Sequence, residues 1–348
     1  MPVVRQEVLR QYAFEIFKAT GIPETDARIV GDHLVESQLA GHDSHGTWFI
    51  PSYAQGMRKN YVRWEERLVV RENPSLTILD CKGGNGIVAV TRALELAAAK
   101  ARTATFGFVG LHNLSHIGRL GAYPPQLAQQ GLLGMVWLNG GGLFMTPFGS
   151  ADRRLRPEPI AFAAPRRQGV APFMLDMTMT TVAGGKIEQK LIRNQPLPEG
   201  WVIDQQGQWV TDGQRYRNAE ETGVPPLGGL QFGHKGYGLA MMVEMLVGPL
   251  SHAGCTKGDK GGGNGVMVLA IDISAFTSLD NYVDEVEGLA EWVCSAKPLP
   301  GFNKVYAPGE IEEETRQRRL QEGIDVAEKT WAEIGKTATG LGVAIPKV

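Results

Sequence analysis

The sequence predicts a mixed α/β core that is capped by helices from both ends of the chain. Three observations lead to this prediction: helical spacing of apolar residues before residue 60, short β-rich runs separated by helical stretches after Ser75, and a charged helical stretch from Gly309 onward. A chain of 348 residues is long enough to bury a sizeable core and to form about two or three structural units.

The N-terminal region is expected to be helical. Apolar residues recur at helical spacing over Val8–Phe17 and stop at Gly21. Pro23 then starts a second helix, which runs into the polar segment Gly41–Gly46. A further helix is expected over Trp48–Met57, so the Gly41–Gly46 segment lies between two helices.

The central region alternates between β-rich and helical stretches. The β-rich runs are Leu76–Leu79, Phe106–Val109, Leu133–Trp137, Ile160–Ala163, Phe173–Leu175 and Gly265–Ile271. Helices are expected over Val90–Thr103 and Tyr123–Gln130, and a glycine-rich loop over Gly261–Gly265. Gly84–Ala89 matches the G-x-G-x-x-A dinucleotide pattern, but no acidic residue follows the next strand to hold a ribose. We therefore interpret this segment as a tight turn.

Composition narrows the class of protein. A formal charge of -2 lacks the basic footprint of a nucleic-acid-binding protein. Three widely spaced cysteines form neither a disulfide framework nor a metal-ligand set, which favours a reducing cytoplasm. The longest apolar stretch, Tyr237–Leu250, contains Glu244 and is too short to span a bilayer. We expect a cytoplasmic protein without membrane or nucleic-acid partners.

Two segments place a histidine and small polar side chains directly before a glycine. In the first, Asp43 and Ser44 precede His45; in the second, Ser115 precedes His116. Histidine titrates near neutral pH, so these segments favour proton-transfer chemistry, although an isolated histidine is more often merely packed. Arg119 lies at the end of the same strand as His116 and could bind an acidic substrate or form a salt bridge. No H-x-H or H-E-x-x-H spacing is present, so no metal site is predicted.

Two further segments are suited to an anion. A strand ends at Asp176, and a threonine-rich turn then leads to a helix that begins with Gly184-Gly185-Lys186. Gly233–Gly238 opens another helix with His234 and Lys235 among three glycines. Backbone N–H groups at a helix start can bind a phosphate, and glycines allow it to approach closely, although ordinary capping is the alternative.

Five motifs recur in one order. They are D-S-H-G followed by Pro51 and Tyr53, N-x-S-H-x-G, P-F-x-L-D-M, G-H-K-G-Y-G-L-A-x-M-V-E and the P-G-E of Pro308–Glu310. Together they resemble the type-2 malate/L-lactate dehydrogenase family, over about Val8 to Leu341. This family also contains ureidoglycolate, diketogulonate and sulfolactate dehydrogenases and a cyclic-imine reductase.

The resemblance implies an NAD- or NADP-dependent oxidoreductase that interconverts 2-oxo and 2-hydroxy acids, and a homodimer with shared active sites. The implied fold has a largely antiparallel, non-Rossmann cofactor domain (residues 75–299) and a helical substrate and dimerisation region (residues 1–74 and 300–348). Carried over by position, the implied roles are catalytic for His45 and His116, substrate-binding for Ser44, Tyr53 and Arg119, and cofactor-binding for Asp176, Met177, Thr178, His234, Lys235, Gly309 and Glu310. The two histidines compete for the proton-donor role.

Two departures from the family pattern bear on specificity. Phe49 stands where relatives often carry an arginine for the substrate carboxylate, which suggests an apolar pocket wall. The family's G-T-N-P segment is replaced by Arg156–Pro159, and Arg153, Arg154 or Arg156 could substitute for the lost arginine. The alternatives are cyclic-imine reduction, a nucleotide-binding homologue that has lost catalysis, and a histidine-dependent lyase or isomerase.

Overall fold

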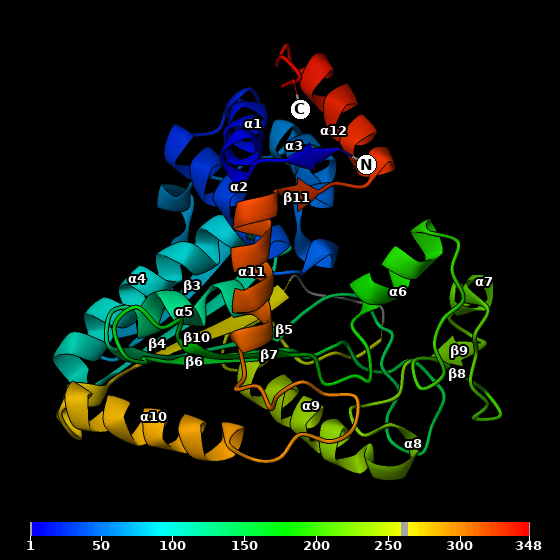
Figure 1. Ribbon diagram of the computed structural model, residues 1–348. Coiled ribbons are helices and arrows are strands. Elements are labelled where there is room, and N and C mark those ends of the chain that lie inside the picture. Colours follow the sequence, from blue (N-terminus) through cyan, green and yellow to red (C-terminus); the bar gives the residue numbers. More distant parts are fainter. Residues whose placement is uncertain (1, 259–263, 348) are drawn as a thin grey trace.

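The computed structural model describes residues 2–258 and 264–347. Its centre is a seven-stranded sheet in the order β2-β3-β4-β10-β5-β6-β7 (Figure 1). Of the described neighbouring pairs in this sheet, only β3 and β4 run parallel. The strands are β2 (Leu68–Asn73), β3 (Leu76–Gly84), β4 (Phe106–Leu114), β5 (Leu132–Asn139), β6 (Ile160–Ala164), β7 (Phe173–Met177) and β10 (Asn264–Asp272). The predicted α/β class with a mixed, largely antiparallel sheet is confirmed.

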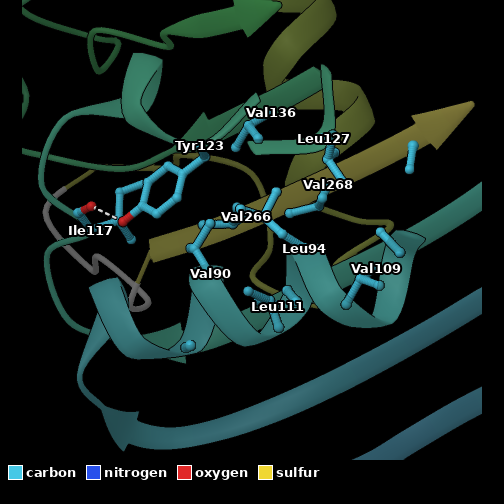
Figure 2. Packing of buried hydrophobic residues seen from close by; sticks show 14 of the residues in the cluster. Val90, Leu94, Val109, Leu111, Ile117, Tyr123, Leu127, Val136, Val266 and Val268 are labelled. Carbon is cyan, nitrogen blue, oxygen red and sulfur yellow. Dashed lines mark hydrogen bonds between the residues drawn. The ribbon is translucent and has the colours of Figure 1, made fainter. Parts of the chain in front are cut away.

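Helices cover both faces of this sheet. Helices α4 (Gly86–Ala104) and α5 (Pro124–Ala128) pack on one face, and α9 (His234–Val247) packs on the other (Figure 1). Figure 2 shows the core between α4 and the sheet, which includes Val90, Leu94, Val109, Leu111, Val266 and Val268. The Tyr123 hydroxyl donates to the Ile117 carbonyl in the same core, so its polar atom is satisfied where it is fully buried.

Both ends of the chain build one helical layer. Helices α1 (Gln6–Lys18), α2 (Glu24–Leu39), α3 (Ile50–Lys59) and α12 (Glu328–Gly340) gather at one end of the molecule, and α11 (Glu310–Glu322) runs from the sheet toward them (Figure 1). Strand β1 (Val3–Val4) pairs with β11 (Ile324–Asp325), which fixes the two ends to each other. This confirms the predicted helical portion from both termini.

The remaining elements surround the sheet edge and its lower face. They are α6 (Gly184–Ile192), β8 (Ile203–Asp204), α7 (Gly213–Tyr216), β9 (Thr222–Gly223), α8 (Gly229–Phe232) and α10 (Leu279–Cys294). In the Gly84–Ala89 segment, the Asn85 side chain accepts from the Val88 N–H and caps α4, as expected of a turn. Most of the predicted Gly261–Gly265 loop lies outside the described residues. Within the described ranges, no helix combines the length and apolarity needed to cross a bilayer.

Candidate active site

His116 follows the end of β4 and is held through its Nδ1 atom. The Tyr53 hydroxyl of α3 lies 2.5 Å from Nδ1, and the backbone N–H of Gly118 donates to the same atom at 3.3 Å. Because a backbone N–H can only donate, Nδ1 is an acceptor, and the hydrogen of the neutral imidazole sits on Nε2. The surroundings of His116 therefore fix its tautomer.

His45 lies against His116, so the two histidine segments singled out in the sequence meet in the fold. The two imidazole rings stack with centroids 5.9 Å apart and planes 13° from parallel. Ser44 Oγ lies 3.0 Å from Nδ1 of His45. His45 belongs to the 3-10 turn η1 (Asp43–His45), which follows α2. Helix α2 packs on α4 beside the His116 segment, and this contact brings the two histidines together.

Both histidines are neutral at pH 7. Burial, assisted by the neighbouring His116, lowers the pKa of His45 to about 3. Burial lowers the pKa of His116 to about 4, and it raises the pKa of Tyr53 above its usual value. Each neutral imidazole can donate a hydrogen bond from its N–H and accept one at its other ring nitrogen, without placing a positive charge in the apolar surroundings.

Aromatic side chains line the histidines on one side. The Phe49 ring lies 4.8 Å from the His116 ring and 6.5 Å from the His45 ring. Trp48 packs on Phe49 at 4.3 Å and donates from Nε1 to the Ser44 carbonyl, and Tyr53 completes this aromatic wall 5.4 Å from Phe49. Trp48, Phe49 and Tyr53 offer apolar contacts to the two imidazoles, and none of these three side chains carries a positive charge.

Arg119 forms a buried ion pair with Asp176. Its Nε atom lies 3.2 Å from Oδ2 of Asp176, and the side chains are 5% and 13% exposed. The backbone N–H of Gly121 donates to the same carboxylate oxygen at 3.0 Å. The Arg119 backbone N–H donates to Nε2 of His33 at 2.9 Å. Two residues to which we assigned different roles, substrate and cofactor binding, are thus brought together.

The segment around Gly309 lies beside β7. The backbone N–H of Met174 donates to the Pro308 carbonyl at 3.2 Å, and a Cβ at Gly309 would come within 3.1 Å of Met174. A cavity of about 1220 Å³ extends from Arg119 and Met174 past Gly309 to α11, and a second one, of about 480 Å³, adjoins Gly309 and Glu310. Met174 on β7 and Gly309, far apart in sequence, therefore lie along one groove, which Arg119, the ion-pair partner of Asp176, also lines.

Other predicted site residues lie elsewhere. His234 and Lys235 are exposed at the start of α9, where His234 packs edge-on against Phe148 at 5.5 Å and Lys235 lies over the Phe232 ring. The Thr178 hydroxyl bonds the Pro157 carbonyl at 2.9 Å, and Met177 packs in a small hydrophobic cluster near α9. No group of three His, Cys, Asp or Glu side chains in the described part of the chain is placed to hold a metal ion.

Sequence reasoning missed two residues at the site. His33 is buried on α2, its ring is 5.0 Å from that of Tyr123, and burial lowers its pKa to about 3. The one sequence signal for the burial of His33 is its position on the apolar face of α2. Gly185, at the start of α6, packs on the Asp43–His45 turn, since a Cβ there would lie 2.8 Å from the Ser44 Cβ. No local signal in the sequence predicts this contact.

Comparisons with known proteins show the family of this chain. The model of the family described as malate/L-lactate dehydrogenase matches residues 4–335. This chain belongs to that family. Its relatives are hydroxy acid dehydrogenases, so the hydroxy acid oxidoreductase class predicted from the motifs is confirmed.

Individual relatives align along nearly the whole chain. A malate dehydrogenase from Pyrococcus horikoshii is 33% identical, with 98% of this chain and 96% of the relative covered. Its solved structure superposes with a TM-score of 0.88, covering 99% of this chain and 96% of that one. An L-sulfolactate dehydrogenase from Methanocaldococcus jannaschii is 29% identical over 99% of this chain and 98% of the relative. A Δ1-piperideine-2-carboxylate reductase from Pseudomonas syringae shares the fold, with a TM-score of 0.79 and 22% sequence identity. The superposition covers 97% of this chain and 100% of the reductase chain.

Proposed function

We propose that this member of the family is an NAD- or NADP-dependent dehydrogenase that interconverts a 2-oxo acid and the corresponding 2-hydroxy acid. The observation that supports this most strongly is the stacked pair of neutral histidines, one with a fixed tautomer, in a molecule whose cavity of about 1220 Å³ is lined by Arg119, three residues after His116. The nicotinamide, when bound, supplies the hydride that adds to C2 of the oxo acid.

His116 is proposed to act on the C2 oxygen. Its Nε2–H would donate a hydrogen bond to the carbonyl oxygen. As the hydride adds to C2, the Nε2 proton would pass to that oxygen, and the ring would regain a proton from water. Tyr53 holds the far nitrogen of the ring and positions it. His45, with Ser44 at its Nδ1, is the second candidate for the proton donor, and Ser44 is a candidate contact for the substrate.

The proposed cofactor site is the groove along β7 and α11. Gly309 lines both cavities and Glu310 lines the smaller one, and Gly309 has a φ of 97° that favours glycine. Asp176 contacts Arg119 and Gly121, which line the larger cavity, and we propose Asp176, Met177 and Thr178 as cofactor contacts although none of the three lines either cavity. A side chain at Gly309 would narrow the groove against Met174. His234 and Lys235 are proposed cofactor contacts, although both are exposed on α9, away from the two cavities. The groove lies between the proposed cofactor domain, residues 75–299, and the helical region, which contributes Gly309 and α11.

The aromatic wall suggests which 2-oxo acid fits. Trp48, Phe49 and Tyr53 would contact the substrate side chain, and Arg119 is already paired with Asp176. A second carboxylate, as in oxaloacetate, would lie against apolar rings without compensation, which is unfavourable. We therefore propose a substrate whose side chain is apolar.

We further propose a homodimer. The helical region (residues 1–74 and 300–348) is proposed to contribute to substrate binding and dimerisation, together with an exposed apolar surface on α9 and α10, which lies within residues 75–299. Large apolar side chains remain exposed on α9, where Met245 is 59% exposed, and on α10, where Trp292 is 79% exposed. A second copy would remove this surface from water. Sedimentation of the wild type and of Met245→Glu tests this: a dimer that the substitution dissociates supports the proposal, and a wild-type monomer contradicts it.

The activity test is absorbance of the reduced nicotinamide, with NADH and NADPH separately. The substrates would run from pyruvate and oxaloacetate to phenylpyruvate, with one cyclic imine. We expect turnover with an apolar 2-oxo acid and a shift of preference toward oxaloacetate in Phe49→Arg. Cofactor binding without turnover would favour a homologue that has lost catalysis, and absence of cofactor binding would contradict the nicotinamide proposal.

A further inference from the structure

A cavity of about 380 Å³ separates the catalytic segment from helix α6. One wall is the chain from Ala40 to Ser44, and the opposite wall is α6 with the loop after it. Lys186, Lys190 and Arg193 line the α6 side, and their spacing of four and three residues places them on one helix face. The cavity therefore combines Ser44 with a row of cations.

The acidic groups around this cavity are already paired. His42 Nε2 lies 3.4 Å from Glu312, and Arg319 Nη1 lies 2.6 Å from Asp43. On α6 itself, Lys190 donates to the neutral Gln195 side chain at 3.1 Å. Among the described residues, Lys186 and Arg193 have no ion-pair partner, so the α6 wall carries uncompensated positive charge.

Of the three cations on α6, Lys186 is the closest in sequence to Gly185, the residue that contacts Ser44. The adjacent Gly185 packs so tightly on Ser44 that an added Cβ would lie 2.8 Å from its Cβ and 3.3 Å from its Oγ. Ser44 Oγ in turn lies 3.0 Å from the imidazole of His45. Lys190 and Arg193 begin one and two helical turns farther along α6.

The arginines that the sequence offered as replacements are committed elsewhere. Arg153 donates to the Thr222 and Tyr216 carbonyls, each at 2.6 Å, and Arg156 is buried and donates to Asn139. Arg154 pairs with Asp152 at 2.8 Å. None of the three lines the cavity beside Ser44. Lys186 is therefore better placed than these arginines to neutralise a substrate carboxylate.

We propose that Lys186 binds the C1 carboxylate of the substrate, in the cavity between Ser44 and α6. This inference rests on the proposed function and deepens it: Phe49 faces the apolar side chain, and the positive charge comes from α6. A lysine ammonium group is a compact positive charge that attracts an anion over a long range. Salt weakens this attraction. The site would therefore select monocarboxylic 2-oxo acids with apolar side chains.

The test compares Lys186→Met with Lys190→Met, which removes the same charge one turn away on the same face. Each variant would be assayed with the best 2-oxo acid of the panel and with its uncharged methyl ester. We expect Lys186→Met to raise KM for the acid at least tenfold while the ester is unaffected, with Lys186→Arg restoring most of the loss. Lys190→Met should change KM less than threefold. Equal effects of the two variants, or equal loss for acid and ester, would overturn the inference.

A binding measurement separates this inference from the proposed activity. Oxamate carries a carboxylate beside an amide carbonyl and is not reduced, so calorimetry with and without NADH reports anion binding alone. Lys186-dependent oxamate binding by an enzyme that reduces no 2-oxo acid would support the site and contradict the activity. Oxamate binding that survives in Lys186→Met, or that the wild type lacks, would overturn the assignment of Lys186.

Discussion

Glu158 is a buried carboxyl group whose pKa is strongly raised, and Glu158→Gln tests the consequence for stability. It lies in the segment that departs from the family pattern, is fully buried, and has a φ of 44°. Among the described residues, neither of its carboxyl oxygens has a hydrogen-bond partner. Burial, and then the nearby charge of Glu244 on α9, raises the pKa of Glu158 to about 10, while Arg156 opposes the rise. Glu158 is thus neutral in the folded protein at pH 7.

This protonation makes stability depend on pH. The folded protein keeps the proton of Glu158 up to about pH 10, whereas the unfolded chain releases it above about pH 4.5. The folded state therefore binds more protons between these values, and the free energy of unfolding falls as pH rises through that window. A difference of one proton corresponds to roughly 1 kcal/mol per pH unit. The amide of Glu158→Gln carries no charge at any of these pH values and removes this dependence.

The assay is urea unfolding at pH 6, 7, 8 and 9, followed by tryptophan fluorescence. We expect the free energy of unfolding of Glu158→Gln, relative to wild type, to increase by roughly 1 kcal/mol for each pH unit. Glu199→Gln, which changes an exposed carboxyl in the same way, should leave the wild-type slope intact. A constant difference between wild type and Glu158→Gln across this range would refute the buried neutral carboxyl, even if the variant were more stable.

Three further substitutions test the packing and hydrogen bonds of the site. Gly185→Ala should lower kcat about tenfold, because its Cβ would meet the catalytic segment at 2.8 Å, whereas Gly184→Ala, with ordinary 3.5 Å contacts, should retain activity. Asp176→Asn should lower the free energy of unfolding by about 3 kcal/mol in urea titrations, since Arg119 stays buried without its anion; an unchanged value would contradict a buried ion pair. Tyr53→Phe should lower kcat about tenfold without changing cofactor affinity in calorimetry, and parallel losses in both would argue against a positioning role.

Much of the fold follows from local patterns in the sequence. Each predicted β-rich run falls within a strand of the central sheet, because these runs are buried and their β-branched and apolar residues pack on both faces. The two histidine segments meet because each follows an element of the core, α2 or β4. Both segments can be recognised in the sequence because they place polar residues next to a glycine. Packing of the core does not require this pattern, whereas a functional role does.

Other features depend on contacts that local sequence does not encode. Strand β2 is exposed along its whole length, so it has no alternation of buried and exposed residues to signal a strand. Strands β1 and β11 are two residues long and pair across nearly the whole chain. The packing of Gly185 on Ser44 depends on how α6 is placed by the fold, and no spacing rule connects the two segments.

The placement of the histidines at the junction of the helical layer and the sheet explains how a neutral pair is maintained. From the helical layer, α2 supplies His33, which accepts the Arg119 backbone N–H, and α3 supplies Tyr53, which bonds His116. From the sheet, Asp176 at β7 neutralises Arg119, so its charge is balanced locally beside the imidazoles. If the two parts separated, water would reach the rings and their pKa values would return toward the ordinary value for histidine. The contact between layers therefore sets the protonation state of the site as well as its geometry.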